Sequence, residues 1–191
     1  MKYIKNFTFV LAAAFLAMAC ETQMVDKLDD FNLEQGGYMR TVTPFPVVNS
    51  TFSVSRANLT GTKMEAVLEA VTPDKGALFS SYDLSIRFID ATPANGTNTT
   101  VARTLRSIPA SAYSKDPTTG YPRHTLSITG TEALTACGLT AADISTGDRF
   151  EVTAVMRLSN GRAFTASNTG VNITGGAFYS SPFFYRLNVV N

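Results

Sequence analysis

Two segments of the chain alternate apolar and polar residues with a period of two, a pattern typical of half-buried β-strands. The first places one apolar face at Tyr82, Leu84, Ile86 and Phe88. The second places another at Phe150, Val152, Ala154, Met156 and Leu158, with Val155 as an apolar exception on the polar face. Successive side chains of a strand point to opposite faces of its sheet, so each segment predicts a strand with one buried face.

The residues after the second strand predict a hairpin, whose loop length follows from the pairing it produces. A two-residue loop would place a charged side chain opposite Phe164. A three-residue loop of residues 159–161 instead places Met156 opposite Phe164 and Ala154 opposite Ala166. We therefore predict the three-residue loop, with Gly161 in the left-handed conformation that this turn requires.

Weaker strand patterns fill most of the remaining chain after residue 36. They cover Tyr38 to Thr43, Thr51 to Val54, Lys63 to Val71, Thr99 to Leu105, His124 to Thr129 and Phe183 to Val190. Many short strands separated by turn residues, without a long helical period, favour an all-β fold. We predict a single domain over residues 36–191, an antiparallel immunoglobulin/fibronectin-like β-sandwich with one short helical crossover, and a small barrel is the alternative.

The helical crossover is predicted by a capping pattern between two strands. Thr129 with Glu132 three residues later could form a capping box over Ala133 to Cys137, and Gly138 would end the helix. Asp148 opens the next strand after a glycine, which is typical of a solvated carboxylate or of one that caps a turn.

The N-terminal segment has the layout of a bacterial secretory signal. Lys2 and Lys5 precede an apolar run from Phe7 to Ala19, which is shorter than a membrane-spanning helix, although a retained transmembrane anchor is an alternative. The run ends in Leu-Ala-Met-Ala-Cys, which resembles a lipobox with Cys20 as the acylated residue. We predict a signal peptide at 1–19, a lipid anchor on Cys20 and a polar tether over 20–35, and therefore a protein attached to a membrane.

Composition and motifs give no indication of catalysis, metal binding or a cofactor. Nucleophilic catalysis needs a base, and the one histidine, His124, shares the apolar parity of its strand, which favours a half-buried structural role. The other cysteine, Cys137, is expected to pack as a small apolar residue, with a disulfide to Cys20 as the alternative. Zinc-ligand spacings and phosphate-binding loops are absent from the sequence. A net charge of +1 without a basic stripe also argues against nucleic acid as a partner.

Ligand binding is the remaining class, and sugar recognition requires aromatic rings exposed on loops. The chain has no tryptophan. Tyr113 and Tyr121 lie in a predicted loop, and Phe178 and Tyr179 follow a pair of glycines. We take these four as candidate ligand-binding residues, while noting that buried aromatic residues usually belong to the core.

Several segments together resemble a family of Bacteroidetes surface lipoproteins. Besides the lipobox they are LEQGGYMRT, GLTAADISTGDRFEV, NGRAFTASNT and YSSPFFYRLNV, which spread over most of the chain. Proteins of this kind look like accessory partners of starch-utilisation-type outer-membrane uptake systems. The resemblance implies a non-enzymatic, outer-membrane, cell-surface protein that holds a glycan or a peptide near a TonB-dependent transporter, or docks on that transporter and its substrate-binding lipoprotein.

A structural role is the second hypothesis. A cell-surface adhesin or fimbria-like subunit accepts a strand from its neighbour at an exposed sheet edge, and Tyr38 to Thr43 could be such a donor.

The lipid anchor is directly testable. We expect mass spectrometry of the processed protein to find a chain that begins at Cys20 with diacylglycerol on its sulfur. An unmodified sulfur, or cleavage several residues downstream, would contradict the predicted membrane attachment.

Overall fold

The computed structural model describes residues 36–170, 174 and 183–191, excepting the side chains of Asp74 and Asn95. The chain divides into two compact units, Met1–Glu34 and Gln35–Asn191, and every described residue belongs to the second unit. The predicted signal peptide, Cys20 and the tether lie outside the described residues. None of the helices within the described ranges has the length and apolar character needed to cross a membrane.

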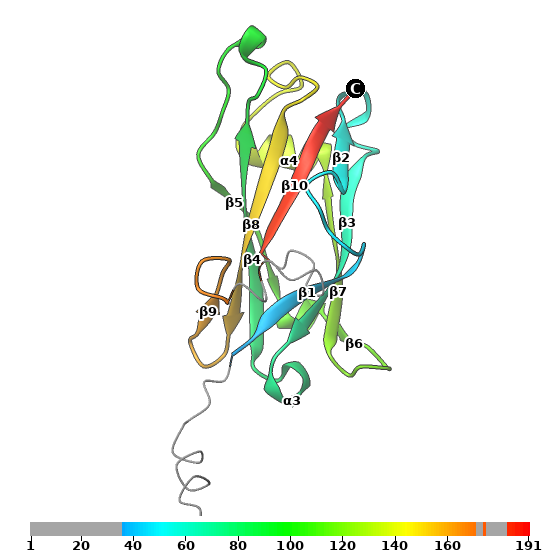
Figure 1. Cartoon of the computed structure of the whole chain (residues 1–191), viewed down its shortest axis with the longest axis vertical. Helices are drawn as coiled ribbons and strands as arrows, with labels where there is room; N and C mark the ends of the chain where they lie inside the picture. The colour runs from blue at the N-terminus through cyan, green and yellow to red at the C-terminus, as the bar shows by residue number, and fades with distance from the viewer. Residues whose placement is uncertain (1–35, 171–173, 175–182) are drawn as a thin grey trace, which may run out of the picture. The chain divides into compact units, whose positions relative to one another are not determined.

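The second unit contains two β-sheets (Figure 1). Sheet A has the strand order β1 (Tyr38–Thr43), β3 (Lys63–Val71), β7 (Pro122–Thr129) and β6 (Ser114–Lys115). Sheet B has the order β2 (Phe52–Ser55), β10 (Phe184–Val190), β8 (Arg149–Leu158), β4 (Phe79–Ile89) and β5 (Arg103–Pro109), and β9 (Ala163–Phe164) also pairs with β8. The connections include α3 (Pro73–Gly76), α4 (Gly130–Cys137) and the 3₁₀ turns η1 (Arg56–Asn58), η2 (Pro93–Asn95) and η3 (Ala110–Ala112).

One hydrophobic core lies between the inner faces of the two sheets and confirms the predicted all-β sandwich. The two strongest sequence patterns supply its centre, since the apolar positions of β4 and β8 are buried while most of the intervening ones are not. Sheet A contributes alternate residues such as Met64, Leu68 and Leu126. Alternation along each strand therefore determines which face is covered by the other sheet.

The predicted helical crossover is confirmed and connects the two sheets. The Thr129 hydroxyl accepts a hydrogen bond from the Glu132 amide at 3.1 Å, which caps the first turn of α4. Gly138 ends the helix in the left-handed conformation, with φ of 70°. The Glu132 carboxylate forms an ion pair with Arg106 of β5, 3.2 Å away, so the crossover is attached to sheet B.

The predicted hairpin register is also confirmed. Met156 lies opposite Phe164, and Gly161 has a φ of 85°. The expected pairing of Ala154 with Ala166 is wrong, because β9 ends at Phe164. The Ala154 amide instead donates to the Phe183 carbonyl at 3.0 Å, so β10 takes over this edge of β8.

Two other expectations were wrong. One pair of strands, β2 with β10, is parallel rather than antiparallel; a parallel pair cannot be joined by a tight hairpin, and these two strands are far apart in the sequence. β5 begins at Arg103 rather than Thr99, because the hydroxyls of Thr99 and Thr100 accept hydrogen bonds from the Asp90 and Phe88 amides. Such side-chain bonds compete with strand pairing.

A buried ion-pair network joins the strands of sheet A on its outer face. Arg40 of β1, Glu69 of β3 and Arg123 of β7 are register partners in one row. The Glu69 side chain is 1% exposed and accepts hydrogen bonds from Arg40, from Arg123 Nε at 2.7 Å and from the Thr119 hydroxyl at 3.0 Å. Arg123 also pairs with Asp116 at 2.7 Å.

This network predicts a large effect for Glu69→Gln. The substitution leaves two partly buried guanidinium groups without a carboxylate between them, so we expect unfolding to become easier by about 3 kcal/mol. Glu65→Gln is the matched control, since Glu65 lies on the same strand with a half-exposed side chain, and should change stability by less than about 1 kcal/mol. Chemical denaturation measures both, and equal effects would contradict the network's role.

Candidate functional site

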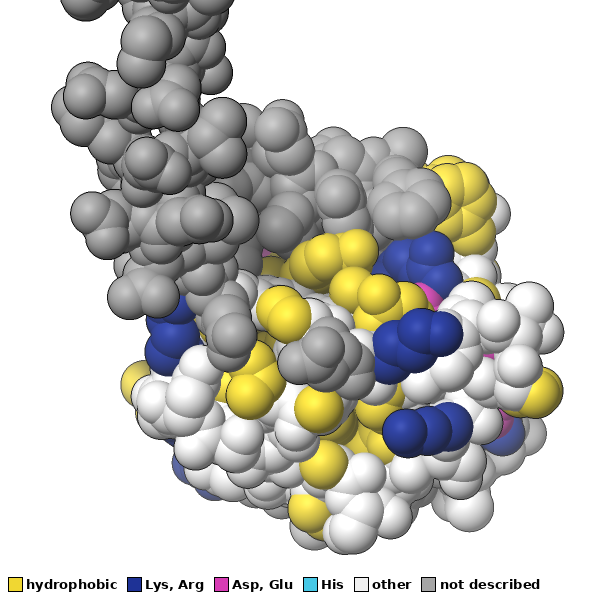
Figure 2. Space-filling model, turned by 90° about the horizontal axis from the view of Figure 1, so that it is seen from below, with side chains coloured by type: hydrophobic (Ala, Val, Ile, Leu, Met, Phe, Trp, Pro, Cys, Tyr) yellow, Lys and Arg dark blue, Asp and Glu magenta, His cyan; other side chains and the backbone are white. Residues whose placement is uncertain are grey.

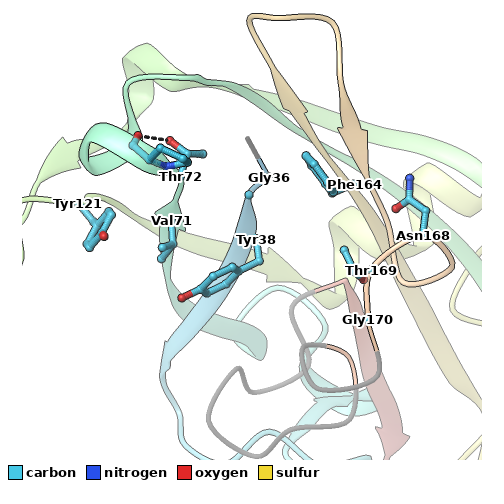
Figure 3. A pocket seen from close by; sticks show the side chains of 11 residues that line it. Gly36, Tyr38, Val71, Thr72, Tyr121, Phe164, Asn168, Thr169 and Gly170 are labelled. Carbon is cyan, nitrogen blue, oxygen red and sulfur yellow. Dashed lines mark hydrogen bonds between the residues drawn. The ribbon is translucent and has the colours of Figure 1, made fainter. Parts of the chain in front are cut away.

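A pocket of about 450 Å³ lies at the end of the sandwich that carries α3 and β9. Figure 2 shows this end, where apolar side chains gather beside several lysine and arginine side chains. Its aromatic lining residues are Tyr38, Tyr121 and Phe164 (Figure 3). The others are Gly36, Gly37, Val71, Thr72, Pro73, Asn168, Thr169 and Gly170.

The two sheets supply opposite walls of this pocket. Tyr38 at the start of β1 and Val71 at the end of β3 are register partners and project from the same face. Tyr121 precedes β7, which pairs with β3, and so belongs to the same wall. Phe164 of β9 lies across the pocket from Tyr38 (Figure 3). The pocket therefore lies between the end of sheet A, on the face that also carries Arg40 and Glu69, and β9 with the segment that follows it.

Two glycines permit the close packing around this gap. A Cβ on Gly37 would lie 3.0 Å from Thr72 Cγ2 and 3.3 Å from Met156 Cε. Gly76, with φ of 85°, allows α3 to lie against Pro122, since a Cβ there would approach Pro122 Cδ to 2.3 Å. A side chain at either position would displace a wall of the pocket.

The segment after β9 is held by its own hydrogen bonds. Asn168 Oδ1 accepts from the Thr165 amide at 2.7 Å, and its Nδ2 donates to the Ala163 carbonyl at 2.8 Å. The Thr169 hydroxyl donates to the Thr165 carbonyl at 2.7 Å. Across the pocket, the Thr72 hydroxyl donates to the Pro73 carbonyl at 3.0 Å. Both hydroxyls keep acceptor capacity toward a ligand, so the pocket combines aromatic rings with a few positioned polar groups.

The four candidate aromatic residues have different positions. Tyr121 lines the pocket, and Phe178 and Tyr179 lie outside the described residues. Tyr113 is not an exposed loop residue as expected, because its ring is 9% exposed and packs edge-on to Phe79 at 4.8 Å. The short turn η3 before it directs the ring into the core. Binding by Tyr121 stays a prediction.

Tyr38 and Phe164 are the aromatic pocket residues that the sequence did not indicate as ligand contacts. Tyr38 lies two positions before Arg40 and so shares the polar face of its strand. An aromatic residue on the polar face of a strand could have indicated a ligand contact from the sequence alone. Phe164 lies opposite Met156, as expected. Its side chain is only half-buried, because the core ends at this point.

The side chains that the sequence offered as possible catalytic or metal-binding groups have structural contacts instead. His124 is half-buried as predicted, with Nδ1 3.0 Å from the Ala112 carbonyl oxygen and its ring 5.0 Å from that of Tyr113. Cys137 is a buried free thiol within the core, as predicted, and burial raises its pKa. Asp148 is buried, so the solvated alternative is wrong. It accepts from the Ser145 amide at 2.6 Å and the Ala91 amide at 2.9 Å, which confirms the turn-capping alternative.

Within residues 36–170, 174 and 183–191, no group of three or more histidine, cysteine or carboxylate side chains is arranged to hold a metal ion. In comparisons with known proteins, no protein-family model and no curated protein sequence matches the chain. The resemblance to Bacteroidetes surface lipoproteins therefore stays a prediction.

A group of phenols in the core yields a test of the Tyr113 assignment. The Tyr113 hydroxyl is buried and has no hydrogen-bond partner among the residues that the structure describes. The Tyr185 hydroxyl, in contrast, lies 3.2 Å from that of Thr41 and 3.5 Å from that of Tyr82. We expect Tyr113→Phe to leave stability unchanged or to raise it by up to about 1 kcal/mol, because it removes an unsatisfied polar group. Tyr185→Phe should lower stability by about 1 kcal/mol. Thermal unfolding measures both, and a destabilised Tyr113→Phe would show that its hydroxyl has a partner.

Proposed function

We propose that this chain is a non-enzymatic outer-membrane lipoprotein that binds a glycan as an accessory component of a TonB-dependent nutrient uptake system. The observation that carries the proposal is the pocket between Tyr38, Tyr121 and Phe164. Its volume of about 450 Å³ falls within the range of small-molecule sites. The sandwich is proposed to belong to the immunoglobulin-like class.

Pocket chemistry supports a sugar as the ligand. A pyranose ring presents apolar C–H faces and a rim of hydroxyl groups, so it pairs with aromatic faces and with a few hydrogen-bonding groups at the side. Tyr38 and Phe164 provide rings from opposite walls, and the hydroxyls of Thr72 and Thr169 can accept hydrogen bonds. The largely apolar lining does not suit a strongly charged ligand.

The position of the pocket in the chain supports a role at a membrane. Gly36, where the predicted tether joins the domain, is one of its lining residues. With Cys20 acylated, a ligand bound there would stay within a short tether of the membrane surface, close to a transporter embedded in it.

The alternative function, a cell-surface adhesin or fimbria-like subunit, is favoured by one observation. β1 is an edge strand of sheet A, and among the described residues only β3 pairs with it. Because Met39 of β1 is fully buried, removal of β1 would open the core and would not test strand exchange cleanly. Sedimentation of the intact processed chain over a range of concentrations is the better test, and a monomer throughout would contradict this alternative.

Substitutions in the pocket test the proposed function. After a glycan array has identified a neutral oligosaccharide ligand, we expect Tyr121→Ala and Phe164→Ala to weaken its binding about tenfold, because each removes a stacking surface. Calorimetric titration measures the affinity. Phe45→Ala is the matched control, since Phe45 is 59% exposed and lies outside the pocket. Unchanged affinity in both pocket variants, or no glycan ligand at all, would contradict the proposal.

A further inference from the structure

The outer face of sheet B carries two adjacent rows of side chains, most of them polar, across β10, β8 and β4. Strand register places Arg186 opposite Glu151 and Glu151 opposite Arg87. The next row places Phe184 opposite Thr153 and Thr153 opposite Ser85. Figure 1 shows these three strands side by side in the sheet. Residues two apart on a strand share a face, so both rows face away from the core.

The first row, together with the neighbouring Arg149, has more positive than negative charge. Glu151 accepts hydrogen bonds from Arg87 Nε at 2.8 Å, Arg87 Nη2 at 2.6 Å and Arg149 Nε at 2.8 Å. Arg186 donates through Nε to the side chain of Asn188 at 2.8 Å, and among the described residues it has no carboxylate partner. This part of the outer face therefore carries three guanidinium groups and one carboxylate, and half of the Arg87 side chain is exposed.

The corresponding row of sheet A provides a contrast. There Arg40 and Arg123 also flank a glutamate, but Asp116 supplies a second carboxylate and balances the charge. On sheet B, burial by itself would raise the Glu151 pKa, but hydrogen bonds from Arg149 and Arg87 hold that pKa below its usual value. Glu151 is therefore ionised at neutral pH. The surplus positive charge on sheet B comes from the arginine side chains that Glu151 does not neutralise.

A hollow of about 300 Å³ adjoins this charged row. Its lining includes Ser85, Thr153 and Phe184 of the second row, and Thr165 and Ser167 from the segment after β9. Hydroxyl groups can both donate and accept hydrogen bonds, which matches the hydroxyl groups of a sugar ring. Guanidinium groups match carboxylate and sulfate oxygens through paired N–H donors.

We propose that the outer face of sheet B is a second binding site, which takes an acidic saccharide. The sugar ring occupies the hollow beside Ser85 and Thr153, and its carboxylate or sulfate pairs with Arg87 and Arg186. This site is separate from the pocket at the end of the sandwich and does not depend on the function proposed for that pocket.

Calorimetric titration of the full processed chain in detergent tests this site with four probes. They are a trigalacturonate, a sulfated galactose disaccharide, neutral galactotriose and a poly-glutamate decapeptide. We expect at least one acidic saccharide to bind at least tenfold more tightly than galactotriose and the peptide, with affinity that falls as salt rises. The two acidic probes distinguish carboxylate from sulfate. Tighter binding of the peptide, or equal binding of neutral and acidic sugars, would overturn the proposal.

Variants then locate the bound ligand. Arg186→Gln breaks no ion pair of the described residues, so it should fold normally and weaken acidic saccharide binding about tenfold. Thr153→Leu should weaken it similarly by filling the hollow. Arg157→Gln is the matched control. It removes an equal charge from sheet B, but the Arg157 side chain is already paired with Asp83. The site is excluded if Arg157→Gln reduces binding as much as Arg186→Gln. Tyr121→Ala should leave this binding unchanged, which separates failure of this site from failure of the end pocket.

Discussion

The division of one edge of β8 between two strands determines both candidate sites. β4 pairs with β8 along its whole length, from Phe79 to Ile89. On the opposite edge, β10 pairs with Arg149 to Thr153 and β9 with Met156 and Arg157. The backbone N–H and C=O groups of a buried strand need hydrogen-bond partners along both edges. On this edge of β8, the short strands β10 and β9 supply them. The chain leaves the edge where they meet, and the segment after Phe164 forms part of the wall of each site.

Local chemistry accounts for the features that could be predicted from the sequence. Alternation located β4 and β8, and the choice of loop at Gly161 located the partner of Met156, because both depend on neighbours within a few residues. The caps at Thr129 and Asp148 belong to the same class. Thr99 and Thr100 show the limit of such reasoning. β-Branched residues favour strands, yet a threonine hydroxyl can also bond to a backbone amide and end one.

The sites could not be derived in this way because their residues meet only through long-range pairing. Tyr38 and Tyr121 share a wall because β1 and β7 both pair with β3. Arg87, Glu151 and Arg186 form a row only when three strands adopt their registers, and a shift of one residue would turn each of these side chains into the core. Tyr113 illustrates the converse, since its loop position predicted exposure while a short turn directs its ring into the core.

Charge balance explains why the two outer faces of the sandwich should have different roles. A buried carboxylate between two arginines stabilises sheet A only when the charges and hydrogen bonds are complete, and Asp116 and Thr119 complete them. Glu151 organises the arginines of sheet B in a similar row, but Arg87 extends half of its side chain into solvent. Hydrated guanidinium groups on a twisted sheet cost little stability, so selection for stability alone does not require a second carboxylate there. The surplus charge is thus available for recognition, whereas the balanced row of sheet A holds its strands together.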